Sequence, residues 1–100
     1  MSYKYSFVLS KGDDMIYISH LDLMRLLSRA ARRAGLKIEL SKGFSPHFKI
    51  KMKKALKLGV ASNNEEGELS LLEPMEAVQI ASRWAKELPE GVQIKSVIAL

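Results

Sequence analysis

Residues 19–34 carry the clearest structural signal in the chain, that of an amphipathic helix with a defined start and end. Ser19 stands at the N-cap position, and Asp22 three residues later suits both a capping interaction and the positive end of the helix dipole. Gly35 follows as a left-handed C-cap. The apolar residues at helical spacing form one face, and they are Leu23, Met24, Leu26, Leu27, Ala30, Ala31 and Ala34.

Alternating or apolar segments around this helix predict strands. Residues 3–9 are rich in aromatic and aliphatic side chains, and residues 15–18 either extend that strand or pair with it. Apolar residues alternate with charged ones over residues 36–40 and again over residues 48–52, as expected of half-buried strands. Residues 56–60 are ambiguous, and one interpretation is that they continue the second of these strands past an irregularity near Ala55.

The C-terminal part of the chain repeats the combination of strand and helix. We expect a hairpin turn at residues 62–67, a strand at 68–72, a helix that starts at Pro74, and a strand at 92–98. The apolar face expected for this helix consists of Met75, Val78, Ala81, Ala85 and Leu88. If one hairpin strand is an addition to the basic fold, this order predicts an α+β fold of the ferredoxin-like split βαβ type. Such a fold is an antiparallel sheet with two helices on one face. That fold hosts many functions, so it does not decide between them.

Length and composition limit the chemistry. One hundred residues predict a single domain over residues 1–100. The chain contains no cysteine, which excludes a cysteine-ligated iron–sulfur cluster, a thiolate zinc site and a cysteine nucleophile. We expect no cofactor and no metal. No segment is apolar over the ~20 residues of a membrane span, and the N-terminus does not read as a signal peptide, so we expect a cytoplasmic protein that does not bind membranes.

The first candidate site is a stripe of arginines. Sixteen Lys and Arg residues against eleven Asp and Glu give a net charge of +5, a balance that suits polyanions. Arg25, Arg29, Arg32 and Arg33 cover roughly a quarter of the helix circumference, opposite its apolar face. Guanidinium groups match phosphate oxygens well. The alternative is a solvated helix face on which Asp22 and Arg25 form a local pair.

The second candidate is the loop Ser41–His47 with the strand that follows. Gly43 allows close approach of a ligand, and Pro46 holds its neighbour extended. Phe44 could stack on a nucleic-acid base, but we expect it to pack in the core. Lysines also line this region, and they either bind a polyanion or keep the outer face of the sheet hydrated: Lys42, Lys49, Lys51 and Lys53.

The third candidate is the pair of histidines. His20 lies in the first turn of the helix, on its apolar side, and His47 ends the loop. Two imidazoles could serve as acid and base in RNA cleavage without a metal. The alternatives are that His20 fills the seam between helix and sheet and that His47 orients the loop. Two histidines without a clustered carboxylate make a poor metal site.

These segments resemble a known family. Residues 18–25, 29–36, 41–47, 56–62 and 88–92 are similar to the N-terminal part of the radical-SAM-linked domain of unknown function, in which a Ser-His-Leu-Asp motif opens a helix and a Gly-Phe-x-Pro-His loop follows. The resemblance implies a bacterial protein encoded beside or fused to radical SAM proteins, often near a ribonuclease of the G/E type, and hence a link to RNA modification or processing. It carries over to His20, Asp22, Arg25, Arg32, Arg33, Gly43, Phe44, Pro46 and His47.

The resemblance also has limits. Family members are usually longer, so we expect that a C-terminal part of the family domain is absent here. A radical SAM enzyme needs three cluster-binding cysteines, which this chain lacks.

Three functions follow as hypotheses. The first is a non-catalytic accessory domain that binds RNA, or a protein partner such as a radical SAM protein, through its basic surface. The second is a metal-independent endoribonuclease that uses His20 and His47. The third is a structural interaction domain, which a large exposed apolar patch would favour.

Overall fold

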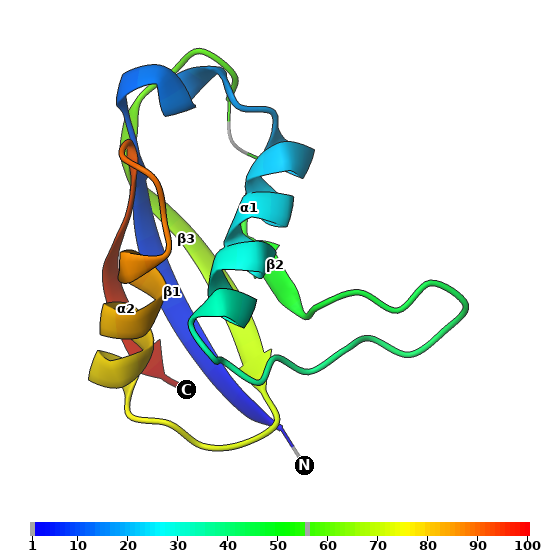
Figure 1. The fold of residues 1–100 in the computed structure, drawn as a ribbon. Coiled ribbons are helices and arrows are strands. Elements are labelled where there is room, and N and C mark those ends of the chain that lie inside the picture. The colour runs from blue at the N-terminus through cyan, green and yellow to red at the C-terminus, as the bar shows by residue number, and fades with distance from the viewer. Residues whose placement is uncertain (1, 56) are drawn as a thin grey trace.

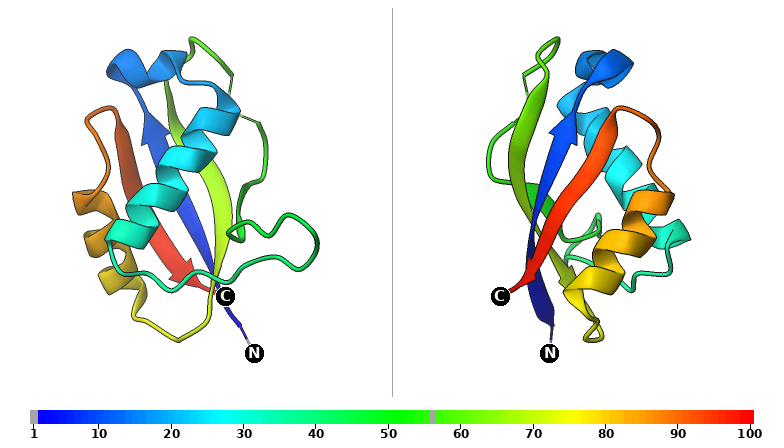
Figure 2. Two further views of the ribbon diagram at one scale, coloured as in Figure 1. Left: turned by 45° about the vertical axis from the view of Figure 1, so that its right-hand side comes forward. Right: turned by 90° about the vertical axis from the view of Figure 1, so that its left-hand side faces the viewer.

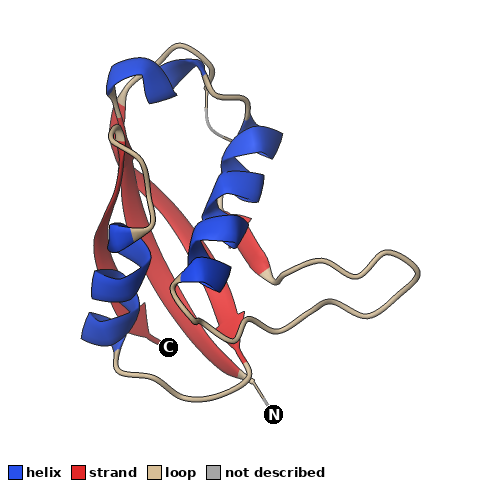
Figure 3. Cartoon of the chain, viewed as in Figure 1, coloured by secondary structure: helices blue, strands red, loops and turns tan. Residues whose placement is uncertain are grey.

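A four-stranded antiparallel sheet forms one layer of the molecule, and two helices lie across one face of it (Figures 1 and 2). The computed structural model describes residues 2–55 and 57–100. The strands are β1 (Tyr3–Lys11), β2 (Ile50–Met52), β3 (Ser62–Leu71) and β4 (Val92–Ala99), in the spatial order β2-β3-β1-β4. The helices are α1 (His20–Arg33) and α2 (Ala77–Lys86), with a short 3₁₀ helix at Asp13–Tyr17 (Figure 3). The expected α+β fold with a ferredoxin-like split βαβ arrangement is confirmed.

The core lies between the sheet and the two helices. On β1, Tyr5, Phe7 and Leu9 are buried toward the helices, as the two-residue period of a strand requires. Trp84 of α2 meets the ring of Phe7 edge to face, with 4.9 Å between centroids, and its Nε1 donates a hydrogen bond to the carbonyl of Leu27 in α1. One buried side chain therefore joins both helices and the central strand.

Helix α1 begins and ends as the sequence predicts. The side chain of Ser19 accepts a hydrogen bond from the backbone N–H of Asp22. At the other end, Gly35 has φ +79, its N–H bonds to Arg32, and the N–H of Leu36 bonds to Ala31. These two bonds form a Schellman motif. Leu23, Leu27, Ala30 and Ala31 are fully buried, which confirms the predicted apolar face.

Several predicted strands differ from the structure. Residues 36–40 form only isolated bridges, from Ile38 to Leu71 and from Leu40 to Phe48, and the strand expected at residues 48–52 is shortened to β2. Residues 15–18 belong largely to the 3₁₀ helix rather than to a strand. In the ambiguous segment 56–60, residue 56 lies outside the described residues, and residues 57–60 form a turn and no strand.

The hairpin turn expected at residues 62–67 is wrong, because this segment is the first half of β3. The partner strand β1 reaches Lys11, and β3 pairs with it from Ser62 to Leu71. The polar composition of residues 62–66 is compatible with a strand here, since several of these side chains are exposed to solvent.

The start of α2 also differs. The helix begins at Ala77 rather than at Pro74, after Glu76 as N-cap. The hydroxyl of Tyr5 holds the preceding segment extended, since it accepts a hydrogen bond from the N–H of Met75 and donates one to its carbonyl. The buried face contains Ile80 and Trp84, whereas Val78 is 75% exposed. The face that is buried is the one that carries the bulkiest apolar side chains. The predicted face therefore points in a different direction around the helix from the observed one.

Candidate binding surface

The arginines of α1 form one exposed surface. All four side chains are exposed, and Arg29, Arg32 and Arg33 together line a shallow depression. Arg25 lies 3.4 Å from a carboxylate oxygen of Asp22. Within residues 2–55 and 57–100, no acidic side chain lies within ion-pair distance of the other three arginines. We call Arg29, Arg32 and Arg33 the arginine surface; its positive charge is not neutralised by neighbouring carboxylates.

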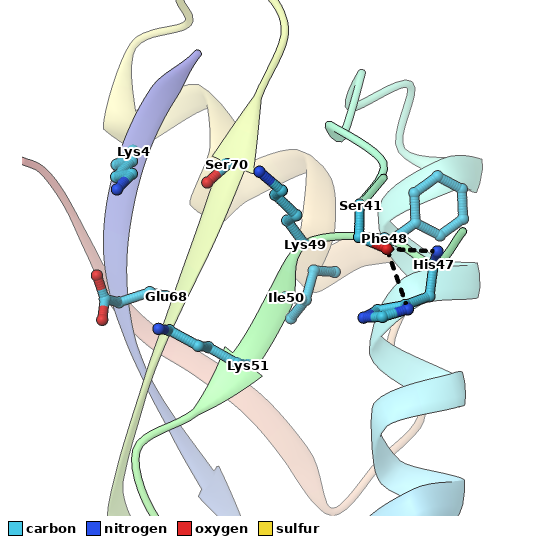
Figure 4. Close-up of a pocket in the computed structure, with 9 residues that line it drawn as sticks. All are labelled: Lys4, Ser41, His47, Phe48, Lys49, Ile50, Lys51, Glu68 and Ser70. Atoms are coloured by element: carbon cyan, nitrogen blue, oxygen red, sulfur yellow. Dashed lines mark hydrogen bonds between the residues drawn. The ribbon is translucent and has the colours of Figure 1, made fainter. Parts of the chain in front are cut away.

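The lysines of the β2 region are more nearly balanced by acidic side chains. Nζ of Lys49 lies 3.4 Å from Oε2 of Glu39, and Nζ of Lys53 lies 3.1 Å from Oε2 of Glu66. Lys51 stands opposite Glu68 in the register between β2 and β3, and both line a hollow of about 380 Å³ shown in Figure 4. This arrangement favours the interpretation that the lysines keep the sheet hydrated. Lys4 and Ser70 also line this hollow, so its walls are partly polar.

The loop that follows α1 projects far from the sheet (Figure 1). Phe44 is fully exposed on it, so the expectation that this ring packs in the core is wrong. The reason is that the loop extends away from both the sheet and the helices, so neither layer covers the ring of Phe44. Lys42 and Pro46 are exposed beside it, and Gly43 has a φ of +129 that side-chain-bearing residues rarely adopt.

Ser41 and His47 close the base of this loop. The N–H of Ser41 donates to the carbonyl of His47, and Oγ of Ser41 accepts a hydrogen bond from the N–H of His47. The same Oγ lies 3.1 Å from Nδ1 of His47 (Figure 4). The loop is thus tied at its stem, and the imidazole of His47 is held in place there, in agreement with the interpretation that it orients the loop.

A groove runs between α1 and the stem of the loop. Its volume is about 540 Å³. Five residues of α1 line one wall, and they recur at helical spacing: Leu21, Met24, Arg25, Ser28 and Arg29. The other wall consists of Leu40, Pro46, His47, Phe48 and Ile50. Leu21 and Leu40 are 59% and 51% exposed, which leaves an apolar lining open to solvent.

Sequence reasoning missed this groove. It assigned the residues of α1 to an apolar face and an arginine face, whereas the groove is lined by a stripe between the two. The available signal was Leu21, an apolar residue outside the predicted core face. Arg32 adds a contact across this region, because its guanidinium lies over the ring of Phe48 at 5.8 Å from the centroid.

The two histidines share neither the groove nor the hollow at β2. His47 lines both the groove and the hollow at β2, and His20 lines neither. His20 precedes Leu21 by one residue and so lies about 100° away around the helix. Its Nδ1 is enclosed, with no hydrogen-bond partner in the described part of the chain. The geometry therefore gives paired acid–base chemistry no support.

Two further properties of the described residues concern metals and membranes. In residues 2–55 and 57–100, no three acidic or histidine side chains gather as a metal site would require. The helices described in this part of the chain are too short to cross a membrane.

Comparison with protein families gives a match over nearly the whole chain. Residues 4–100 match the model of a family described as an uncharacterised protein conserved in bacteria (DUF2344). The chain belongs to this family. No curated protein matches it. This description agrees with the expectation of a bacterial domain of unknown function. It gives neither an activity nor a link to radical SAM proteins.

Proposed function

We propose that this DUF2344 domain is a non-catalytic module that binds RNA. The observation that carries the proposal is the arginine surface, three neighbouring guanidinium groups on one exposed helix face that have no acidic partner among the described residues. Guanidinium groups bind phosphate oxygens in a bidentate manner, and they are weakly hydrated compared with ammonium groups. An RNA backbone supplies such oxygens in a row.

The exposed ring of Phe44 adds a second, different contact. Proteins that bind single-stranded nucleic acids combine a basic surface with aromatic side chains on which bases stack. Phe44 is fully exposed on the projecting loop, and the stem of that loop lies across the groove from Arg25 and Arg29. A single strand of RNA whose phosphates contact the arginines would therefore pass close to the loop.

The experiment that tests the proposal is a binding titration with a labelled RNA that contains both single-stranded and paired segments. We expect that replacement of Arg29, Arg32 and Arg33 by alanine weakens binding at least tenfold. The control variant replaces Arg83, Lys86 and Lys95 by alanine. These side chains are also exposed, and their replacement removes the same amount of positive charge from α2 and β4. Equal loss in both triple variants would show that net charge, rather than this surface, determines binding.

The same titration separates the alternatives. An acidic protein, such as the radical SAM protein implied by the family resemblance, would use the same arginines, and the finding that no RNA binds at low salt would favour it. An endoribonuclease would shorten the RNA during incubation in EDTA. We expect that the RNA stays intact.

A further inference from the structure

We propose that the groove between α1 and residues 40–50 takes one unpaired base of an RNA single strand. The inference rests on the proposed function and adds a preference for single-stranded over duplex RNA. It makes the groove, in addition to the arginine surface, a determinant of what binds.

The groove has the composition of a small-ligand site. Its walls are mostly apolar, with Leu21, Met24 and Leu40 among the lining residues, and its volume of about 540 Å³ lies in the range of such sites. An exposed apolar lining of this kind is costly in water unless a ligand covers it. The flat and mostly apolar face of a base would cover it.

Polar groups in the groove fit the edges of a base. His47 and Ser28 both line it, and both carry groups that hydrogen-bond. The hydroxyl of Ser28 donates to the carbonyl of Met24, so its oxygen is left as an acceptor. His47 is held at the stem of the loop by Ser41. Arg25 and Arg29 present planar guanidinium groups, on which unstacked bases pack in RNA complexes.

Charge complementarity distinguishes a nucleotide from an apolar ligand. Arg29 lines both the groove and the arginine surface, so the two are continuous. A base in the groove would place its phosphate next to Arg29, and the neighbouring phosphates would lie toward Arg32 and Arg33. A duplex keeps its bases stacked and paired, so it reaches the arginines but not the groove.

The test compares four probes: an oligouridylate, the same ribose–phosphate strand without bases, an RNA duplex and a poly-glutamate peptide. We expect the oligouridylate to bind about a hundredfold more tightly than the abasic strand, because a base in the groove and a base on Phe44 each contribute about tenfold, or about 1.4 kcal/mol. Replacement of Leu21 and Leu40 by serine reduces this difference about tenfold, to the part that is due to Phe44, and leaves binding of the abasic strand unchanged. The matched control replaces Leu72 and Val78, which are exposed apolar residues elsewhere.

Three results would overturn the inference. Equal affinity for the oligouridylate, the abasic strand and the duplex would show that only phosphates are bound, and the proposed function would stand without the groove. Tighter binding of poly-glutamate than of the oligouridylate would assign the arginine surface to an acidic peptide, which brings no base to the groove. The absence of binding to all three nucleic-acid probes would contradict the proposed function as well.

Discussion

Tyr5 shows how one side chain sets the position of a distant segment. Its ring is buried in the core, and its hydroxyl makes two hydrogen bonds with the backbone of Met75, seventy residues along the chain. The sequence indicates a strand at Tyr5, but it gives no sign of this partner. The start of α2 was therefore misplaced at Pro74.

Replacement of Tyr5 by phenylalanine tests this role. The variant leaves the N–H and the carbonyl of Met75 without this partner, so we expect the free energy of unfolding to fall by about 1–3 kcal/mol. Urea denaturation followed by circular dichroism measures the change. The control is Tyr17→Phe, whose side chain is exposed. A Tyr5→Phe variant as stable as the wild type would contradict the assignment.

Gly67 is a second residue whose role only the structure reveals. A Cβ atom at this position would lie 2.5 Å from Cζ of Phe7 and 2.7 Å from the carbonyl oxygen of Lys51. The ring of Phe7 fits against β3 because the position has no side chain. In the sequence this glycine reads as part of a turn, which is one reason why the start of β3 was missed.

We expect that Gly67→Ala destabilises the fold by about 1–3 kcal/mol, because the added methyl group overpacks the site between Phe7 and β2. Thermal denaturation compares it with Gly12→Ala, where the added atom meets nothing within 4 Å. If both variants melt at the same temperature, the close approach at Gly67 has no energetic importance.

At the scale of the element, α1 was predicted from the sequence because its signals are local. The cap at Ser19, the apolar period and the stop at Gly35 all lie within one continuous segment. β3 was misjudged for the opposite reason. Its pairing with β1 joins residues about 50 to 70 positions apart, and polar residues at its start hide the strand.

The cap of α1 supplies a prediction for the motif that opens this helix. Ser19→Ala removes the hydrogen bond to the N–H of Asp22, so we expect a loss of about 1 kcal/mol in stability. Ser19→Asp restores an acceptor and should recover most of it. RNA affinity should be unchanged in both variants, because the arginine surface lies in later turns of the helix. A loss of affinity in a stably folded Ser19→Ala variant would give this serine a direct role in binding.

The projecting loop shows what the sequence does not determine about a site. The composition of residues 41–47 identifies a loop with an aromatic residue, but whether Phe44 is covered depends on how far the loop stands from the two layers. Its exposure changes the expectation from a core residue to a binding residue.

Phe44→Ala separates binding from folding more cleanly than any core substitution. The ring has no buried contacts to lose, so stability should not change. We expect that affinity for single-stranded RNA falls by about tenfold. The control is Tyr17→Ala, another exposed aromatic residue, on the 3₁₀ helix. Unchanged affinity in the Phe44 variant would remove the loop from the proposed surface.

For the whole molecule, the distribution of charge matters more than its total. The net charge of +5 was evident from the sequence, as were the two basic regions. The structure separates them, because Lys49 and Lys53 have acidic neighbours and the arginine surface has none in the described residues. The pairing of Lys53 with Glu66 depends on the register between β2 and β3, which the sequence did not reveal.

The central claim is that Arg29, Arg32 and Arg33 contact phosphates, and the salt dependence of RNA binding tests it most directly. Each phosphate contact with single-stranded RNA contributes about 0.7 to the slope of log K against log salt concentration. The account predicts that the slope of the triple alanine variant is shallower than that of the wild type by about 2. An unchanged slope would contradict it, because the arginines would then make no ionic contacts with the RNA.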